Sequence, residues 1–185
     1  MQRELTKNIR FVNVEDSNES KAMLSIYSPS IVHTHASFEI EVPSLSDFHS
    51  RVLEYTKKYP WLVYESEGEI LGYAYASAHR SRCAYDWSVE SSVYVSASAQ
   101  RKGIASSLYK TLFEILKAQG VVNVLAGIGL PNEASVAFHE SFAFKKVAHY
   151  TNIGFKLGKW WDVGWWQLEL QLPVRPTAVK SYLTF

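Results

Sequence analysis

SSVYVSASAQRKGIA, residues 91–105, is the part of this 185-residue sequence that decides the fold. It starts with residues of strand type, passes through a polar turn, and runs into apolar residues at helical spacing. Gly120 is expected to end this amphipathic helix. The apolar stripe of the helix consists of Ile104, Leu108, Leu112, Ile115 and Leu116.

The turn at residues 100–105 has the features of a phosphate-binding site. A helix N-terminus exposes backbone N–H groups without intrahelical partners, and the helix dipole adds partial positive charge there. Gly103 lets a bulky anion approach the backbone, and Arg101 and Lys102 add full charges. On this motif alone, an ordinary turn glycine beside two solvated cations is an equally good interpretation. Neither the dinucleotide fingerprint G-x-G-x-x-G nor the P-loop motif is present.

Helical and strand patterns interleave along the rest of the chain, which indicates an α/β or α+β fold with a mixed sheet. Pro29 is expected to end the first helix at Ser28. No linker or repeat divides the chain, so we expect one domain over residues 1–185 with a core at about 9–173. The other predicted elements are strands at 9–14, 61–65, 70–77, 87–95 and 121–128, helices at 44–59 and 133–141, and hairpin strands within 145–172. Ser44 or Ser46 is expected to cap the helix at 44–59.

Composition argues against several classes of protein. The net charge is +1 without a basic tail, so neither nucleic acid nor an anionic membrane is an expected partner. No stretch approaches the roughly 18 apolar residues that a membrane-spanning helix needs. The single cysteine, Cys83, fits a reducing compartment, and the cytoplasm is the expected location. The six histidines are scattered, and no metal site is expected.

Short motifs that run in order through most of the chain resemble those of one enzyme family. The sequence is similar to the GNAT superfamily of acetyl-CoA-dependent N-acetyltransferases, and within it to the phosphinothricin and methionine sulfoximine/sulfone N-acetyltransferases. This resemblance implies a GNAT fold, with a mixed central sheet splayed at the cofactor-binding strand and flanked by helices. It also implies direct acetyl transfer to the amine of a small amino-acid analogue. The motifs are Tyr59–Val63, Tyr85–Trp87, Glu90–Ser91, Val93–Val95, the turn at 100–105, Ile128–Asn132, His139–Glu140, Gly154–Lys156 and Asp162–Gly164.

The resemblance also implies which residues bind acetyl-CoA. The strand Val93-Tyr94-Val95 would pair with the pantetheine arm, and Asn132 and Ser141 would contact the cofactor farther along the chain. No metal is implied. The residues expected to hold the pyrophosphate are Arg101, Lys102, Gly103, Ile104, Ala105 and Ser106.

Glu90 and His139 are the candidate catalytic residues. An amine must lose its proton before it attacks a thioester, and a carboxylate such as Glu90 can remove it directly or through water. His139 lies where many superfamily members carry a tyrosine that protonates the departing thiolate, so it could assist with protons. The alternatives are a surface carboxylate on a strand for Glu90 and a half-buried helical histidine for His139.

The loop before Glu90 is the expected acceptor site. In the resembling family this loop meets the carboxylate and phosphinate of the acceptor, and guanidinium groups bind both bidentately. A solvated basic loop is the alternative. The predicted substrate-binding residues are Arg80, Arg82, Cys83, Ala84, Tyr85 and Glu90.

Two further expectations follow from the resemblance. The Trp160–Trp161 and Trp165–Trp166 region would form part of a homodimer interface. Ala143 stands where the family usually has glycine, which would cost free energy if the backbone there needs a positive φ.

Two other functions remain open at this stage. One is a GNAT enzyme for another amine or for a peptide N-terminus. The other is a non-catalytic acyl-CoA sensor on the same scaffold.

Overall fold

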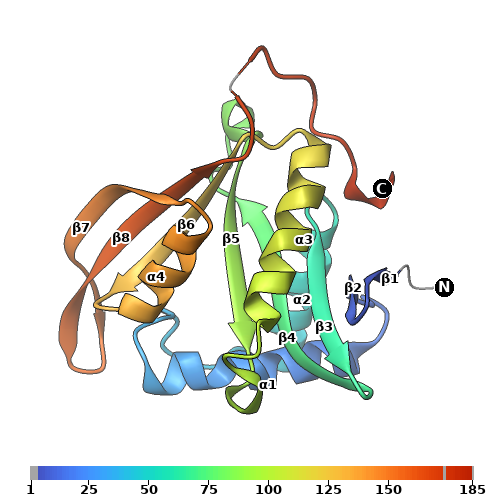
Figure 1. Cartoon of the computed structure of the whole chain (residues 1–185). Helices are drawn as coiled ribbons and strands as arrows, with labels where there is room; N and C mark the ends of the chain where they lie inside the picture. The colour runs from blue at the N-terminus through green and yellow to red at the C-terminus, as the bar shows by residue number, and fades with distance from the viewer. Residues whose placement is uncertain (1–3, 173, 185) are drawn as a thin grey trace.

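The computed structural model describes residues 4–172 and 174–184. Within them, one mixed sheet runs in the order β1-β2-β3-β4-β5-β6-β8-β7 (Figure 1). The helices are α1 (Ser17–His33), α2 (Leu45–Thr56), α3 (Ile104–Gln119) and α4 (Glu133–Ser141). The strands are β1 (Glu4–Thr6), β2 (Ile9–Phe11), β3 (Trp61–Ser66), β4 (Glu69–Ala78), β5 (Ser88–Val95), β6 (Asn123–Leu130), β7 (Lys145–Lys156) and β8 (Lys159–Glu169).

Helices cover both faces of the sheet and enclose two hydrophobic cores. On one face, the apolar stripe of α3 packs against β4, β5 and β6, with aromatic side chains of α4 beside it. On the other face, α1 and α2 cover β3 and β4 with a stripe at helical spacing, Met23, Tyr27 and Ile31, and with Phe48 and Val52. The central strands of the sheet therefore form a buried middle layer, as the interleaved sequence pattern predicts, whereas β7 is largely exposed.

β5 and β6 form the one parallel pair among the described strands, and they stay together only briefly. Their register joins Ser88 to Asn123 and Glu90 to Leu125. Beyond Glu90 the strands diverge, and the gap between them is visible in Figure 1. β6 continues paired with β8 on its other edge, so the separation opens in the middle of the sheet.

Several local predictions are confirmed. The Ser44 side chain accepts from the Asp47 amide and begins α2. Gly120 ends α3 with φ 96°, a left-handed conformation that glycine adopts without steric cost. The predicted bounds of α4, residues 133–141, are those observed.

The prediction that Pro29 ends the first helix is wrong. α1 continues through Pro29 to His33, and Thr34 is its C-cap. The last turn places Ile31 in the core, where it is 1% exposed. Burial of a large aliphatic side chain is worth roughly 1.5–3 kcal/mol, comparable to the cost of proline in a helix. Tertiary packing therefore outweighs the local signal.

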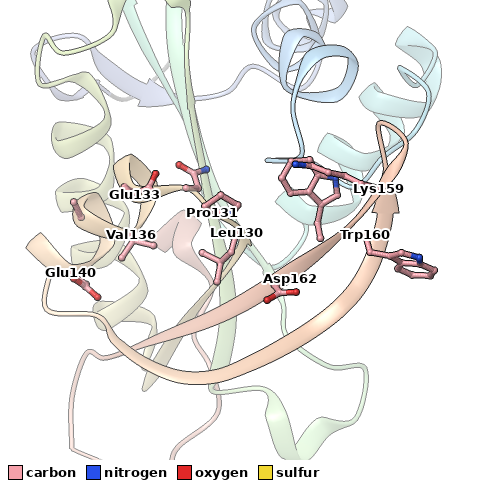
Figure 2. Close-up of a pocket in the computed structure, with 11 residues that line it drawn as sticks. Leu130, Pro131, Glu133, Val136, Glu140, Lys159, Trp160 and Asp162 are labelled. Carbon is pink, nitrogen blue, oxygen red and sulfur yellow. The ribbon is translucent and has the colours of Figure 1, made fainter.

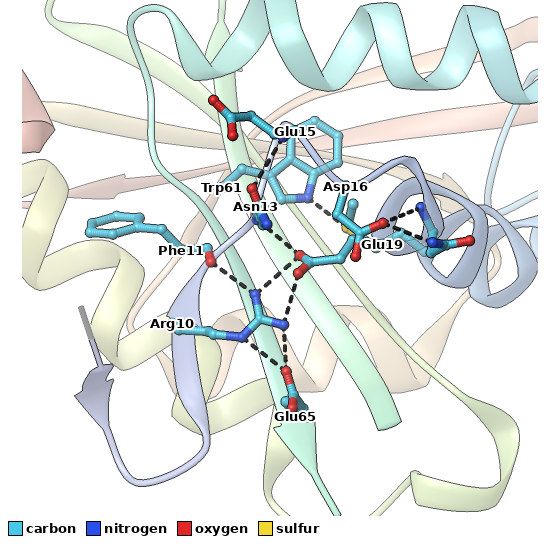
Figure 3. A network of polar contacts seen from close by, with 10 residues as sticks. Arg10, Phe11, Asn13, Glu15, Asp16, Glu19, Trp61 and Glu65 are labelled. Atoms are coloured by element: carbon cyan, nitrogen blue, oxygen red, sulfur yellow. Dashed lines mark hydrogen bonds and ion pairs between the residues drawn. The ribbon is translucent and has the colours of Figure 1, made fainter. Parts of the chain in front are cut away.

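A partly buried ionic network connects β2 to α1 and β3 (Figure 3). The Arg10 guanidinium donates to Glu65 Oε2 from Nε at 2.9 Å and to Glu19 Oε2 from Nη1 at 3.1 Å. The Asn13 amide also donates to Glu19, at 2.9 Å. One guanidinium thus serves two carboxylates on two different elements.

Candidate active site

A cleft opens where β5 and β6 diverge. It encloses about 250 Å³ between the two strands and the helices α3 and α4. Two helices therefore place hydroxyl, amide and imidazole groups against an opening in the sheet. The residues that line it include Ser91, Val93, Tyr94, Ala105, Tyr109, Gly127, Gly129, Asn132, Ser135 and His139.

The edge of β5 that faces this cleft lacks a strand partner after Glu90. On its other edge β5 stays paired with β4 as far as the pair Val95 and Gly72. No described strand pairs with residues 91–95 on the β6 side. Their backbone N–H and C=O groups can therefore bind an extended chain-like ligand, as an added strand would be bound.

The N-terminus of α3 has free backbone donors. Ser107 N donates to Gly103 O and starts the helix, while in the described part of the chain the amides of residues 103–106 donate no hydrogen bond. Gly103 has φ 80° and Arg101 has φ 60°. A non-glycine residue in this region costs about 1–2 kcal/mol, so the turn holds strained backbone at this exposed loop. Free amides at a helix N-terminus fit a pyrophosphate group.

His139 is 6% exposed and hydrogen bonded through both ring nitrogens. Nδ1 lies 2.7 Å from Ser135 O and Nε2 lies 3.2 Å from the Tyr109 hydroxyl. A carbonyl oxygen only accepts, so Nδ1 carries a hydrogen. Burial lowers the pKa of His139, although the bond to Ser135 opposes this shift, so the neutral ring is favoured. Nε2 is then an acceptor for the Tyr109 hydroxyl.

Tyr109 connects His139 to the cleft wall. Its oxygen accepts from Ser91 Oγ at 3.2 Å, and its side chain is fully buried. Burial raises the pKa of Tyr109, so the phenol keeps its proton at neutral pH. The hydroxyls of Ser91 and Tyr109 and the imidazole of His139 form one chain of hydrogen bonds beside the gap. Neither Ser91 nor Tyr109 could be assigned to the site from the sequence, because residues 18 positions apart meet only in the fold.

Glu90 lies on the opposite face of β5 from Ser91, because neighbouring strand residues point to opposite faces. Its carboxylate is 33% exposed and contacts the imidazole of His79, with 2.9 Å between Glu90 Oε1 and His79 Nδ1. Among the described contacts, none joins Glu90 to His139 directly. The two predicted catalytic residues therefore flank β5 from its two sides, and a group in the gap between β5 and β6 could meet both.

An apolar cavity of about 670 Å³ adjoins the cleft and shares Ala36, Gly127 and Gly129 with it. A Cβ on Gly129 would lie 2.5 Å from His35 O, so only glycine lets the 34–44 loop pack this closely. The cavity can accommodate an apolar part of a substrate. Its other walls are Phe38, Ile40, Tyr150, Ile153, Gly154, Phe155, Val163 and Trp165.

The predicted acceptor loop is exposed and lines neither the cleft nor the apolar cavity. It forms a short 3-10 turn, Cys83–Tyr85, directly before β5. The Tyr85 ring lies 6.3 Å from the His79 ring, which brings the loop beside Glu90. The loop thus presents the Arg80 and Arg82 side chains at the outer side of the site.

Two predicted cofactor contacts have local structural partners. The Asn132 side chain accepts from the Ser135 amide at 3.1 Å, so it caps α4 while also lining the cleft. Ser141 is exposed, donates to Phe138 O at 2.7 Å, and does not line the cleft. Among the predicted catalytic and cofactor residues, the cleft brings together Val93, Tyr94, Ala105, Asn132 and His139. The others do not line it; they are Glu90, Val95, Arg101, Lys102, Gly103, Ile104, Ser106 and Ser141.

A second hollow, of about 600 Å³, lies between α4 and the start of β8 (Figure 2). Trp161 is stacked there on His35 at 3.7 Å between ring centroids, with Lys159 Nζ 3.8 Å from the indole centroid. Trp160 points away from the hollow in Figure 2. Neither Glu90 nor His139 lines this hollow, which separates it from the candidate catalytic groups.

No cluster of three or more potential metal-ligating side chains occurs among residues 4–172 and 174–184. No helix within the same ranges is long and apolar enough to cross a membrane.

The chain is similar to known acetyltransferases in sequence and in structure. A family model described as an acetyltransferase (GNAT) domain matches residues 9–165. A phosphinothricin N-acetyltransferase of Streptomyces viridochromogenes is 47% identical over 123 residues, which cover 66% of this chain and 67% of that protein. An L-methionine sulfoximine/L-methionine sulfone acetyltransferase of Salmonella typhimurium is 32% identical and covers 92% of this chain and 98% of its own.

A solved structure of similar fold contains a ligand. It is a GNAT superfamily phosphinothricin acetyltransferase from Sinorhizobium meliloti in complex with acetyl-CoA. The TM-score is 0.80 at 32% sequence identity, with 92% of this chain and 88% of that chain covered.

Proposed function

This chain belongs to the acetyltransferase (GNAT) family, and we propose that it transfers the acetyl group of acetyl-CoA to the amine of a small amino-acid analogue. Relatives are named for phosphinothricin and for methionine sulfoximine and sulfone, which are the acceptors we propose. The observation that carries the proposal is the course of β5. Its unpaired edge begins directly after the candidate base, Glu90, and leads to the free amides of α3.

The donor fits this groove at both ends. The amides of residues 103–106 suit the pyrophosphate, with Arg101 and Lys102 adding charge on the exposed turn. The free backbone edge of Val93 to Val95 suits the amide-bearing pantetheine arm. The donor supplies a thioester carbonyl, and we place it at the cleft between Glu90 and His139. Asn132 remains in the proposal as a cleft-lining contact, and Ser141 only as an outer one.

Glu90 acts as the base in this proposal. At neutral pH an α-amine is mostly protonated and cannot attack a carbonyl carbon until it loses that proton. A partly exposed carboxylate on a rigid central strand can take it, and solvent can then carry it away. The neutral amine attacks from the side of the sheet where Glu90 lies.

Tyr109 and His139 act on the leaving group. The Tyr109 phenol holds its proton, lines the cleft, and can rotate its O–H bond from His139 toward a sulfur atom there. A hydrogen bond to the sulfur stabilises the negative charge that develops as the thiolate departs. His139 Nε2 accepts the hydrogen bond of this O–H group before the thiolate forms, and Ser91 Oγ, which donates to the phenol oxygen, keeps that oxygen in place as the O–H turns.

We assign the acceptor to the region between the basic loop and the apolar cavity, where the His79 ring contacts Tyr85 of the loop and Trp165 of the cavity wall. The guanidinium groups of Arg80 and Arg82 suit a carboxylate or a phosphinate. Tyr85, Cys83 and Ala84 form the turn that holds them next to Glu90. The apolar cavity beside the cleft can take the acceptor's aliphatic part.

The proposal includes a homodimer in the cytoplasm. Trp166 is 2% exposed and therefore belongs to the core of this chain, which corrects its expected place at an interface. Trp160 is 58% exposed and supports a contact surface on the β7–β8 hairpin. The single cysteine, Cys83, fits a reducing compartment. Other exposed apolar side chains on this hairpin are Val147, Tyr150, Ile153, Phe155 and Leu157.

The test is acetyl-CoA turnover, read as release of free thiol, against four acceptors: phosphinothricin, methionine sulfone, a polyamine and a short peptide. We expect turnover with the first two. Turnover only with the peptide or the polyamine would show a GNAT enzyme with another acceptor. No turnover with any amine, together with tight acetyl-CoA binding, would indicate a sensor.

The variant Glu90→Gln tests the base. It should lower kcat by roughly 10²–10⁴-fold while the affinity for acetyl-CoA, measured by calorimetry, stays unchanged. Glu114→Gln, a change of the same kind on the exposed side of α3, is the control and should keep full activity.

A further inference from the structure

One contact beside the candidate base has no part in the chemistry described above. The imidazole of His79, one residue beyond the end of β4, lies 2.9 Å from the Glu90 carboxylate through Nδ1. The register of β4 and β5 produces this contact, since Ser77 is paired with Glu90 and Ala78 with Val89. His79 is therefore carried by the neighbouring strand directly to the base.

The direction of this hydrogen bond follows from the partner. An ionised carboxylate has only acceptor sites, so Nδ1 of His79 carries the hydrogen and donates it to Glu90 Oε1. That nitrogen cannot also receive the substrate's proton from Glu90. His79 is thus a donor to the carboxylate rather than a second base.

The ring of His79 is held from two further sides. Tyr85 meets it edge-on at 6.3 Å between centroids, and Trp165 does the same at 5.7 Å. The side chain is only 14% exposed. An imidazole fixed by two aromatic rings and one hydrogen bond has little rotational freedom, so its N–H points in one direction.

We propose that His79 is a positioning residue that fixes the Glu90 carboxylate in the orientation the reaction needs. It binds Oε1, and in the described part of the chain Oε2 has no hydrogen-bond partner, so that oxygen is free to meet the amine. This inference rests on the proposed role of Glu90 as the base. His79 contacts Tyr85 of the acceptor loop and Trp165 of the apolar cavity. The orientation of the base therefore depends on both parts of the acceptor site.

Two variants of His79 separate hydrogen bonding from packing. His79→Phe keeps an aromatic ring between Tyr85 and Trp165 but removes the N–H donor. His79→Asn removes the ring but places an amide N–H close to where Nδ1 lies. We expect His79→Phe to lower kcat roughly ten- to hundredfold, in line with loss of a hydrogen bond to a charged group. His79→Asn should recover most of that loss.

The KM for acetyl-CoA should stay within about twofold in both variants, because His79 is not part of the donor groove. His79→Gln adds a further check, since its amide lies one atom too far along the side chain and should not restore the rate. His49→Asn is the matched control: His49 bonds to Ser20 Oγ through Nδ1 between α1 and α2, and its loss should leave kcat unchanged.

Equal rates for His79→Phe and the wild type would overturn the inference, and so would His79→Asn variants as slow as His79→Phe. Circular dichroism and thermal melting confirm that each variant is folded, so a slow, folded His79→Phe enzyme with an active His79→Asn counterpart supports it. The wild-type assay distinguishes the two proposals. If the wild type acetylates no amine, the function itself is wrong, whereas an active wild type with an indifferent His79 removes only this inference.

Discussion

At the scale of single residues, Ala143 stands where the resembling family usually has glycine, and the structure shows that the backbone there has a positive φ. Its φ is 67°, in the left-handed region. Its backbone N–H donates a hydrogen bond to Glu140 O at 2.9 Å and closes the last turn of α4. Glycine adopts this conformation without a clash, whereas alanine does not.

Ala143→Gly should therefore stabilise the protein by about 0.5–1 kcal/mol. The substitution relieves backbone strain in the folded state, and the larger conformational entropy of glycine in the unfolded chain offsets part of that gain. Urea denaturation measures this difference. Ala137→Gly, in the middle of α4, should have the opposite sign and cost about 1 kcal/mol. A less stable Ala143→Gly variant would show that strain at this position is negligible.

Tyr109 makes a second prediction at this scale. Tyr109→Phe removes one hydroxyl from the hydrogen-bonded chain and keeps the ring packing. We expect kcat to fall roughly ten- to hundredfold with KM for acetyl-CoA unchanged, because in the proposed mechanism the lost interaction forms only as charge develops on sulfur. Steady-state kinetics with the thiol assay measure it. Tyr182→Phe, which also removes a buried hydroxyl, lies away from the cleft and should retain activity.

His139 links the site to pH. Its pKa is lowered by burial from an ordinary value of 6.5, so the unfolded chain binds this proton more readily than the folded chain. The contribution to stability is present above pH 6.5 and is lost as the pH falls toward the lowered pKa.

His139→Gln should reduce the loss in the free energy of unfolding as the pH falls below about 6.5. Urea denaturation of wild type and variant between about pH 7.5 and about pH 5 gives the comparison, since the carboxylates that titrate there are common to both. Parallel profiles for the two proteins would contradict the prediction.

At the scale of secondary structure elements, local signals in the sequence are reliable where one residue type determines the geometry. Ser44 as a cap and Gly120 as a C-cap are such positions, and both were predictable. Pro29 was misjudged, because the burial of Ile31 depends on the sheet that α1 covers. β6 begins at Asn123 rather than at Val121, since the Val121 amide bonds back to Leu116 O and closes α3.

The network around Arg10 gives a prediction that belongs to this scale. Arg10→Ala leaves Glu19, a residue only 8% exposed, without its cation and removes the ionic contacts from β2 to Glu19 of α1 and Glu65 of β3. Breaking a buried pair in this way costs about 3–5 kcal/mol, and partial exposure of Arg10 and Glu65 should place this case near the lower end. The midpoint of urea denaturation measures the loss.

The control for that prediction is another ion pair of the same chain. Lys57 and Glu54 form an exposed pair on the last turn of α2. Lys57→Ala should change stability by less than about 0.5 kcal/mol, because water screens this pair. If Arg10→Ala and Lys57→Ala lowered the free energy of unfolding by similar amounts, burial of the Arg10 network would add nothing to stability.

At the scale of the whole molecule, the order of motifs along the chain was enough to predict a mixed sheet flanked by helices, but not its active site in full. Glu90 and His139 were named from resemblance, and the structure adds that they flank β5 from opposite faces. His79 and Tyr109 went unnoticed, since their partners lie 11 and 30 residues away and no local periodicity encodes such contacts. Topology, rather than pattern, brings these four side chains to one strand.

The divergence of β5 and β6 also affects how the protein responds to its donor. The edge of β5 beyond Glu90 has no strand partner on the β6 side, and a strand-like ligand can form main-chain hydrogen bonds with it. Folding and donor binding are then thermodynamically coupled, so the melting temperature should climb with donor concentration, by the equivalent of about 2.7 kcal/mol at a hundred times Kd. In a cell, the supply of donor would thereby influence how long each copy of this protein survives.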